Sequence, residues 1–256
     1  MFGKPEYNWV YQTQPEAQLN NRAGPFYQGK VIGGSSAVNG MTYLRGRRQD
    51  FEHWTRLDCT GWDYGSVLKA YLRSEDQRSR GASQYHAVGG PLAVSDPAQL
   101  HVVMGAFIDA AEQAGIPRNP DFNGATQEGA GYYQTMTRNG RRCWSAMAYI
   151  HPVRGRANLT VMTGAQVERV LFDGHNADGV SAIVAGERLT MRALRKVILS
   201  RVPLPLRCCC RPRVSARVRC CSNMASPYCT MRRMSAATCK TTSTRGSATV
   251  AGSRSR

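Results

Sequence analysis

The stretch GKVIGGSSAVNGMTYLRG, residues 29–46, is the part of the sequence whose residue types, at fixed spacing, demand a specific chemistry. Gly33 and Gly34 have no Cβ, so the backbone can take positive φ there and lie directly against a flat ligand. We expect Ser35 or Ser36 to cap a helix that follows, with the first N–H groups and the helix dipole facing that ligand. The stretch therefore predicts a ligand-binding turn.

Asn39 and Gly40 follow this turn at a spacing that keeps a carboxamide and a free N–H near the same surface. This arrangement predicts an anion, or a ring that becomes anionic, as the ligand. Taken alone, a Gly-Gly-Ser-Ser loop that runs into a helix also fits a plain turn with a helix cap. The residues of the loop leave both interpretations open.

The longer frame around the loop resembles the first signature of the glucose-methanol-choline (GMC) flavoprotein oxidoreductases. Tyr43, Gly46 and Glu52 fall where that pattern has an aromatic, a small and a polar residue. In such proteins the loop lies against FAD, which takes hydride from the CH–OH group of a small-molecule alcohol. The resemblance implies FAD contacts at Val31, Gly34, Ser36 and the backbone of Asn39, Gly40, Met41 and Thr42.

Other segments resemble the same family and imply a domain organisation. YHAVGGPLAVSD, residues 85–96, is similar to the entry into the substrate-binding part, and residues 121–150 are similar to the return towards the flavin part. We expect an α/β (α+β) fold with an incomplete FAD-binding domain of GMC type and an antiparallel-sheet substrate domain. The expected ranges are 1–80 for a partial FAD-binding region with the flavin loop, 81–150 for a substrate-domain segment, 151–200 for return strands, and 201–256 for a disordered basic tail.

Periodicity predicts several elements. Tyr7, Trp9 and Tyr11 alternate as on a strand, and residues 67–72 and 102–114 have helical spacing, the latter with Val103 and Phe107 on one face. Residues 158–174 alternate on both sides of Thr163-Gly164 and predict a strand-turn-strand, and residues 195–200 predict a short buried strand. By resemblance, the main chain of Val167 meets the adenine of FAD.

No residue is predicted to be catalytic. His53 is interpreted as a surface or packing residue, and His86 and His101 as structural, because no carboxylate lies at a useful spacing from either of the last two. In the family the catalytic histidine lies near the C-terminus of full-length members, and this sequence has no counterpart. No metal site is expected, because runs such as Cys208-Cys209-Cys210 lack ligand spacing.

The N-terminal segment lacks the G-x-G-x-x-G fingerprint of a dinucleotide-binding half, so the resemblance implies a chain that starts late and is inactive as it stands. It also lacks a signal peptide, and no run of about 18 apolar residues occurs, so a cytoplasmic protein without a transmembrane segment is expected.

Composition changes abruptly after Ser200. Residues 201–256 hold 12 of the 34 Lys and Arg residues, seven of the nine Cys and none of the 17 Asp and Glu. Read two nucleotides later, with G/C-rich third bases, the segment resembles the second GMC signature, so we hypothesise a frameshift near residue 201. DNA reads across these codons test it, and an uninterrupted frame would refute it.

A nucleic-acid-binding protein that uses this basic tail is the alternative function. Twelve positive charges predict salt-sensitive attraction to phosphate backbones. The tail contains no recognition motif, and Tyr228 is its one aromatic residue, so specific nucleic-acid binding is not expected.

Overall fold

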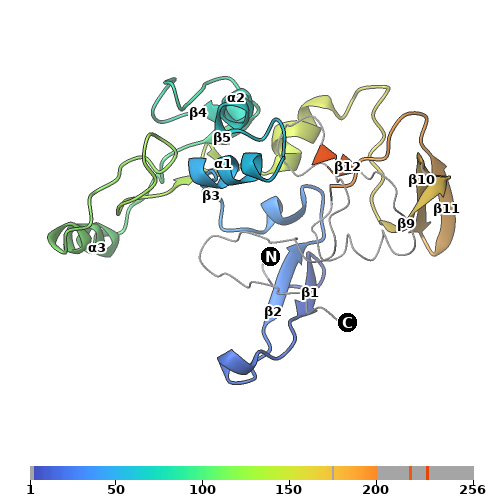
Figure 1. The fold of residues 1–256 in the computed structure, drawn as a ribbon, viewed down its shortest axis with the longest axis horizontal. Helices are drawn as coiled ribbons and strands as arrows, with labels where there is room; N and C mark the ends of the chain where they lie inside the picture. Colours follow the sequence, from blue (N-terminus) through green and yellow to red (C-terminus); the bar gives the residue numbers. More distant parts are fainter. Residues whose placement is uncertain (1–2, 175, 201–218, 221–228, 231–256) are drawn as a thin grey trace. The chain divides into compact units, whose positions relative to one another are not determined.

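The computed structural model describes residues 3–174, 176–200, 219–220 and 229–230. The chain divides into two compact units, Met1–Thr163 and Gly164–Arg256. Helices and short strands are mixed in the first unit, and the described part of the second is formed by antiparallel strands (Figure 1). The mixed fold class predicted from the sequence is confirmed, whereas the predicted domain ranges stay a prediction.

The first unit opens with a hairpin of β1 (Asn8–Gln12) and β2 (Pro25–Gly29). The strands are antiparallel, with Trp9 opposite Gln28, and β1 includes Trp9 and Tyr11 of the alternation that predicted a strand. The Lys30 ammonium lies 4.5 Å from the centroid of the Trp9 ring, and the Lys30 N–H donates to Tyr7 O. These contacts fix the direction in which the chain leaves β2 and enters the glycine loop.

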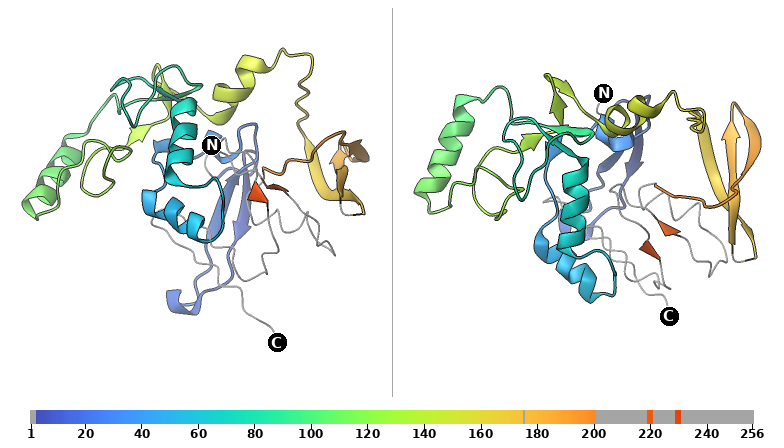
Figure 2. Two further views of the ribbon diagram at one scale, coloured as in Figure 1. Left: turned by 45° about the horizontal axis from the view of Figure 1, so that its top comes forward. Right: turned by 90° about the horizontal axis from the view of Figure 1, so that it is seen from above.

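Two helices follow the loop, α1 (Arg48–Arg56) and α2 (Tyr64–Ser74). The Asp63 carboxylate accepts from the Ser66 N–H at 2.9 Å and so caps α2. The buried Phe51 of α1 packs edge-on against Tyr71 of α2, and Figure 2 shows these helices as neighbours. The predicted helical segment at 67–72 is confirmed.

The core of the first unit surrounds two short parallel strands, β4 (Glu75–Gln77) and β5 (Leu92–Val94). Both strands are fully buried, although every residue of β4 is polar. The buried apolar side chains that gather around β5 include Tyr43, Cys143 and Ala148. A buried polar strand requires partners for each of its polar groups, and these partners form the charged cluster described below.

The third helix, α3, spans Val102–Gln113 and confirms the predicted helix. His101 precedes it and accepts from the Val103 N–H, which confirms a structural role for this histidine. Ile108 is the buried residue of the helix, whereas Val103 is 62% and Phe107 67% exposed. The described part of the chain therefore does not cover the apolar face that the periodicity identified.

Short elements complete the first unit. β3 (Thr42–Tyr43) pairs with β6 (Gln134–Thr135), and β7 (Thr137–Arg138) pairs with β8 (Arg141–Arg142). They are followed by a π-helical turn, Ala146–Ile150, and a 3₁₀ turn, His151–Val153. The β3–β6 pairing joins the end of the glycine loop to a segment more than 90 residues further along the chain.

In the second unit β9 (Ala165–Asp173), β10 (Asn176–Val184) and β11 (Glu187–Arg192) form an antiparallel sheet with β10 in the centre (Figure 1). The predicted strand before Thr163-Gly164 is wrong, because residues 158–163 form none, and the hairpin instead turns at Gly174. The chain also pairs β12 (Arg219–Cys220) with β13 (Cys229–Thr230). The other residues of the predicted tail, and its predicted disorder, lie outside the described residues.

The short buried strand predicted at residues 195–200 is also wrong. Ile198 is 63% exposed and Leu194 wholly exposed, and residue 199 makes only an isolated bridge. These exposures are too large for a strand that is buried on both faces. Among the described residues, no helix is long and apolar enough to cross a membrane.

Candidate functional site

The glycine loop leaves β2 and turns through two residues with positive φ, Gly33 (86°) and Gly34 (55°). A single 3₁₀ turn, Gly34–Ala37, follows, and no serine side chain caps it. The prediction that Ser35 or Ser36 caps a helix is therefore wrong. Ser35 Oγ accepts from the Gly29 N–H and Ser36 Oγ donates to Gly33 O, so both hydroxyls tie the loop to itself. A turn this short has no appreciable dipole, so binding at the loop depends on its backbone shape.

Residues that follow β8 contact the loop and hold it in place. Ser36 Oγ lies 2.9 Å from Ser145 Oγ and also accepts from the Ser145 N–H. Ser145 Oγ donates in turn to Gly33 O at 3.1 Å. A Cβ at Gly33 would lie 2.6 Å from the Trp144 ring, so this glycine is required by the close approach of the indole. Trp144 thus forms part of the support of the loop.

Asn39 fixes the C-terminal end of the loop. Its side-chain oxygen accepts from the Met41 N–H at 3.1 Å and from Arg142 Nη1 at 2.8 Å. Met41 holds positive φ, 63°, which is uncommon for a side-chain-bearing residue. The carboxamide predicted to face a ligand is thus used in part to hold the backbone.

The loop nevertheless leaves space where a flat ligand needs it. A Cβ built on Gly34 or on Gly40 meets no atom within 4 Å. Asn39 and Thr42 are exposed, and Val31 and Met41 are half-buried. These residues and Ser36 lie on one short segment of the first unit. Their contacts with FAD stay a prediction, as does that of Val167, which lies on β9 in the second unit.

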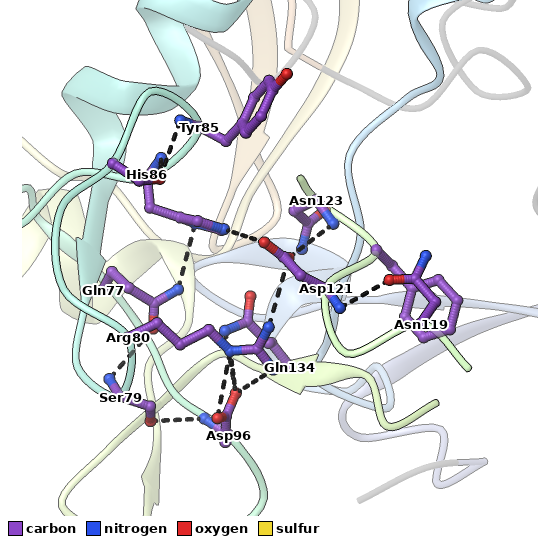
Figure 3. Close-up of polar contacts among 12 residues, drawn as sticks. Gln77, Ser79, Arg80, Tyr85, His86, Asp96, Asn119, Asp121, Asn123 and Gln134 are labelled. Atoms are coloured by element: carbon purple, nitrogen blue, oxygen red, sulfur yellow. Dashed lines mark hydrogen bonds and ion pairs between the residues drawn. The ribbon is translucent and has the colours of Figure 1, made fainter. Parts of the chain in front are cut away.

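A second arrangement, which the sequence did not reveal, is a buried charged cluster in the core of the first unit. Its members are Arg45, Glu75, His86 and Asp121. The Glu75 carboxylate, 0% exposed, accepts from Arg45 Nη2 at 2.9 Å, from His86 Nδ1 at 3.1 Å and from the Ala87 N–H at 3.0 Å. Figure 3 shows His86 Nε2 directed at the Asp121 carboxylate, 2.9 Å away.

The cluster continues on its outer side through Arg80. Arg80 Nη2 lies 2.9 Å from Asp96 Oδ1, and Arg80 Nη1 lies 3.6 Å from Asp121 Oδ1 (Figure 3). Three cationic side chains therefore face three carboxylates, which balances charge inside the unit. The interpretation of His86 assumed that no carboxylate lies near it. That assumption is wrong, because sequence spacing does not show contacts between distant segments. The structural role predicted for His86 fits its position.

His86 is a cation in this cluster. Each of its ring nitrogens faces a carboxylate, and a carboxylate can only accept, so both nitrogens must carry protons. The hydrogen bonds to Asp121 and then to Glu75 raise the pKa of His86 to about 9, against the opposing effect of burial. Burial raises the pKa of Asp121, but the hydrogen bonds from His86 and from the Asn123 N–H outweigh it and leave that pKa lowered.

This pairing predicts a loss of stability at alkaline pH. The pKa of His86 is higher in the folded chain, about 9, than its ordinary value of 6.5, so its contribution is complete below pH 6.5 and is lost as pH rises through 9. We expect the free energy of unfolding to fall by up to roughly 3 kcal/mol over this range.

Urea denaturation between pH 6 and 9 measures the effect, with His86→Gln as the comparison. The variant cannot titrate here, so its stability is expected to change much less with pH, although it is lower at pH 6. Equal pH dependence in the two proteins would contradict the assignment of His86 as a buried cation.

Comparison with known proteins identifies the class of protein. The chain is 42% identical over 199 residues to the oxygen-dependent choline dehydrogenase of Pseudomonas putida KT2440, covering 76% of this chain and 35% of that protein. The crystal structure of pyridoxine 4-oxidase from Mesorbium loti matches with a TM-score of 0.71 and 32% identity, over 76% of this chain and 38% of that one. An FAD-dependent oxidoreductase from Chaetomium thermophilum matches with a TM-score of 0.72 and 25% identity, over 76% and 36%. The fold of the chain is thus similar to part of these two flavoenzyme structures.

The family follows from the sequence profile of the GMC oxidoreductases, which matches residues 10–202. The chain belongs to the GMC oxidoreductase family, and the resemblance of residues 29–46 to the first signature is confirmed at that level. The match ends at residue 202, close to the position of the hypothesised frameshift, which stays a hypothesis. The chain spans about a third of the length of the relative from Pseudomonas putida.

Proposed function

We propose that this chain supplies the flavin loop of an FAD-dependent oxidoreductase that oxidises CH–OH groups of a small-molecule alcohol to a carbonyl. The proposal is supported mainly by the conformation of the loop 31–42, in a chain that belongs to the GMC family. Its glycine positions 34 and 40 open onto free space, while Ser36 and Asn39 hold its backbone rigid. When bound, FAD would supply the acceptor for the hydride of the alcohol.

The residues of the loop contribute binding and orientation. Gly34 and Gly40 let the backbone approach a ring closely, and Val31 offers it an apolar contact. The links from Ser145 and Arg142 fix the loop before any ligand arrives, so less ordering is needed on binding. The N–H groups of Asn39 and Met41 donate within the loop, so the Asn39 side-chain NH₂ and the Gly40 N–H are the donors that would favour a ring that gains negative charge on reduction.

The proton of the alcohol needs an acceptor, and no described histidine belongs to the loop 31–42; His151 lies edge-on to the Trp144 ring. His86 is protonated at neutral pH because of its two carboxylate partners, so it cannot act as a base there. His101 caps α3, and His53 is exposed on α1. We therefore assign no catalytic residue. A choline-like alcohol is the proposed substrate class, since the similar protein of Pseudomonas putida is a choline dehydrogenase.

A chimaera tests this function. Residues 10–200 of this chain replace the matching stretch of the Pseudomonas putida choline dehydrogenase, and choline oxidation is followed by acceptor reduction. We expect activity within about tenfold of the parent, since a supporting scaffold change costs on the order of 1.4 kcal/mol in transition-state free energy. A chimaera that folds and retains FAD but oxidises neither choline nor other small alcohols would contradict the proposed reaction.

A further inference from the structure

The first unit contains a cavity of about 220 Å³ at the start of α1. The segments 45–49 and 122–128 form its walls, with Tyr64 and Tyr85 beside them. None of the loop residues 31–42 lines it, so the proposed flavin function does not account for this cavity.

The lining of the cavity is strongly basic. Its lining residues include three arginines, Arg45, Arg47 and Arg48, and one acidic residue, Glu128. Arg45 is 5% exposed and is neutralised by Glu75 behind the wall. Arg47 lies 3.8 Å from Glu128, whose side chain is 80% exposed, and Arg48 pairs with the half-exposed Glu52. Exposed pairs of this kind contribute little stability, so an anion can compete with these carboxylates at small cost.

The walls are locked together by side chains that bridge the two segments. Asn123 Oδ1 accepts from the Arg45 N–H at 2.8 Å, and Asn123 Nδ2 donates to Tyr43 O at 3.1 Å. Gln127 Nε2 donates to Arg45 O at 2.8 Å. Segments some 80 residues apart in sequence thus form a fixed frame, so the shape of the cavity exists before any ligand binds.

We propose that this cavity binds a phosphate group carried by a small molecule. Guanidinium donors pair with phosphate oxygens through two parallel hydrogen bonds, and Arg47 and Arg48 offer two such groups at one mouth. The start of α1 itself is already capped, because the Asp50 carboxylate accepts from the Arg47 N–H at 3.2 Å, so the arginine side chains and not the helix end would hold the phosphate. The volume accommodates a phosphate with a short organic remainder.

Calorimetric titration of the full chain with inorganic phosphate, and separately with glycerol phosphate, at constant ionic strength tests the proposal. In the Arg47→Gln/Arg48→Gln double variant we expect phosphate affinity to fall at least about tenfold, because two charge-assisted contacts are lost. The matched control is Arg56→Gln/Arg73→Gln, which removes two exposed charges from α1 and α2 outside the cavity. It should change the affinity less than about twofold.

All three proteins keep the same basic tail, so its attraction for phosphate cancels in the comparison, and circular dichroism verifies that each is folded. Tighter binding of glycerol phosphate than of inorganic phosphate identifies an ester as the source of the phosphate group, whereas equal binding identifies the free ion. Equal losses in the two double variants, or no saturable binding by the native chain, would mean an adventitious ion only and would overturn the proposal.

Discussion

Replacing Glu75 by Gln is expected to reduce the free energy of unfolding by about 3–5 kcal/mol, the largest effect of any single substitution considered. The carboxylate is 0% exposed and receives Arg45, His86 and the Ala87 N–H. A neutral amide keeps the shape but removes the charge, and its NH₂ group is a donor that faces other donors. Arg45 then loses its carboxylate partner and His86 keeps only Asp121, in a medium that solvates both cations poorly. The environment of the neighbouring Tyr43 is similar, because burial raises its pKa to about 12.

Urea unfolding followed by tryptophan fluorescence measures this loss. Glu52→Gln is the matched control, because Glu52 also pairs with an arginine, Arg48 at 2.7 Å, but at the surface of α1. It should cost less than about 1 kcal/mol. If the two substitutions had similar effects, the buried cluster would not stabilise the first unit in the way described.

Substituting Gly34 by Leu is expected to weaken FAD binding by at least about 100-fold, measured in the chimaera that carries residues 10–200. A Cβ built on this residue meets no protein atom within 4 Å. The longer leucine side chain would extend from there into the space proposed for the ring. Positive φ adds strain of roughly 1–2 kcal/mol to the folded chain. The strain alone lowers stability, whereas the occupied space would lower affinity.

Gly61→Leu separates these two effects. Gly61 also has positive φ, 82°, and a Cβ there also meets nothing within 4 Å, but it lies between α1 and α2. We expect this variant to lose similar stability and to keep its FAD affinity within about threefold, because no contact with the loop changes. Flavin retention after gel filtration and fluorescence titration of the stripped chimaera give both values. Equal losses of affinity would mean that residue 34 does not face the cofactor.

Sequence reasoning reached the family and the glycine loop because a signature of this length depends on residue types in order along the chain. It also found α2 and α3, whose periodicity is local. It missed the contacts of Glu75 and His86, since their partners Arg45 and Asp121 are brought near only by the pairing of remote segments. A weak signal existed in the run Glu75-Asp76-Gln77, which follows an amphipathic helix directly, yet nothing in its pattern shows that all three residues are buried.

The errors have a common physical origin. Alternation predicted a strand before Gly164 and a buried strand at residues 195–200, but a strand forms only where another edge pairs with it. In the second unit β9, β10 and β11 pair with one another, and no described strand is available to residues 158–163. The serines of the loop likewise satisfied a capping pattern but bond to Gly29 and Gly33 instead, because the loop turns too tightly for an α-helix to start there.

The amount of FAD bound per chain in the purified chimaera tests most directly whether this chain carries a flavin loop. Absorption at the flavin bands after exhaustive dialysis, divided by the protein concentration, gives the ratio. The account predicts a ratio of about one, as in a flavoprotein with a complete site, since residues 31–42 would supply the missing contacts. A chimaera that is folded by circular dichroism and elutes as the parent does, yet is colourless and binds no added FAD, would contradict it.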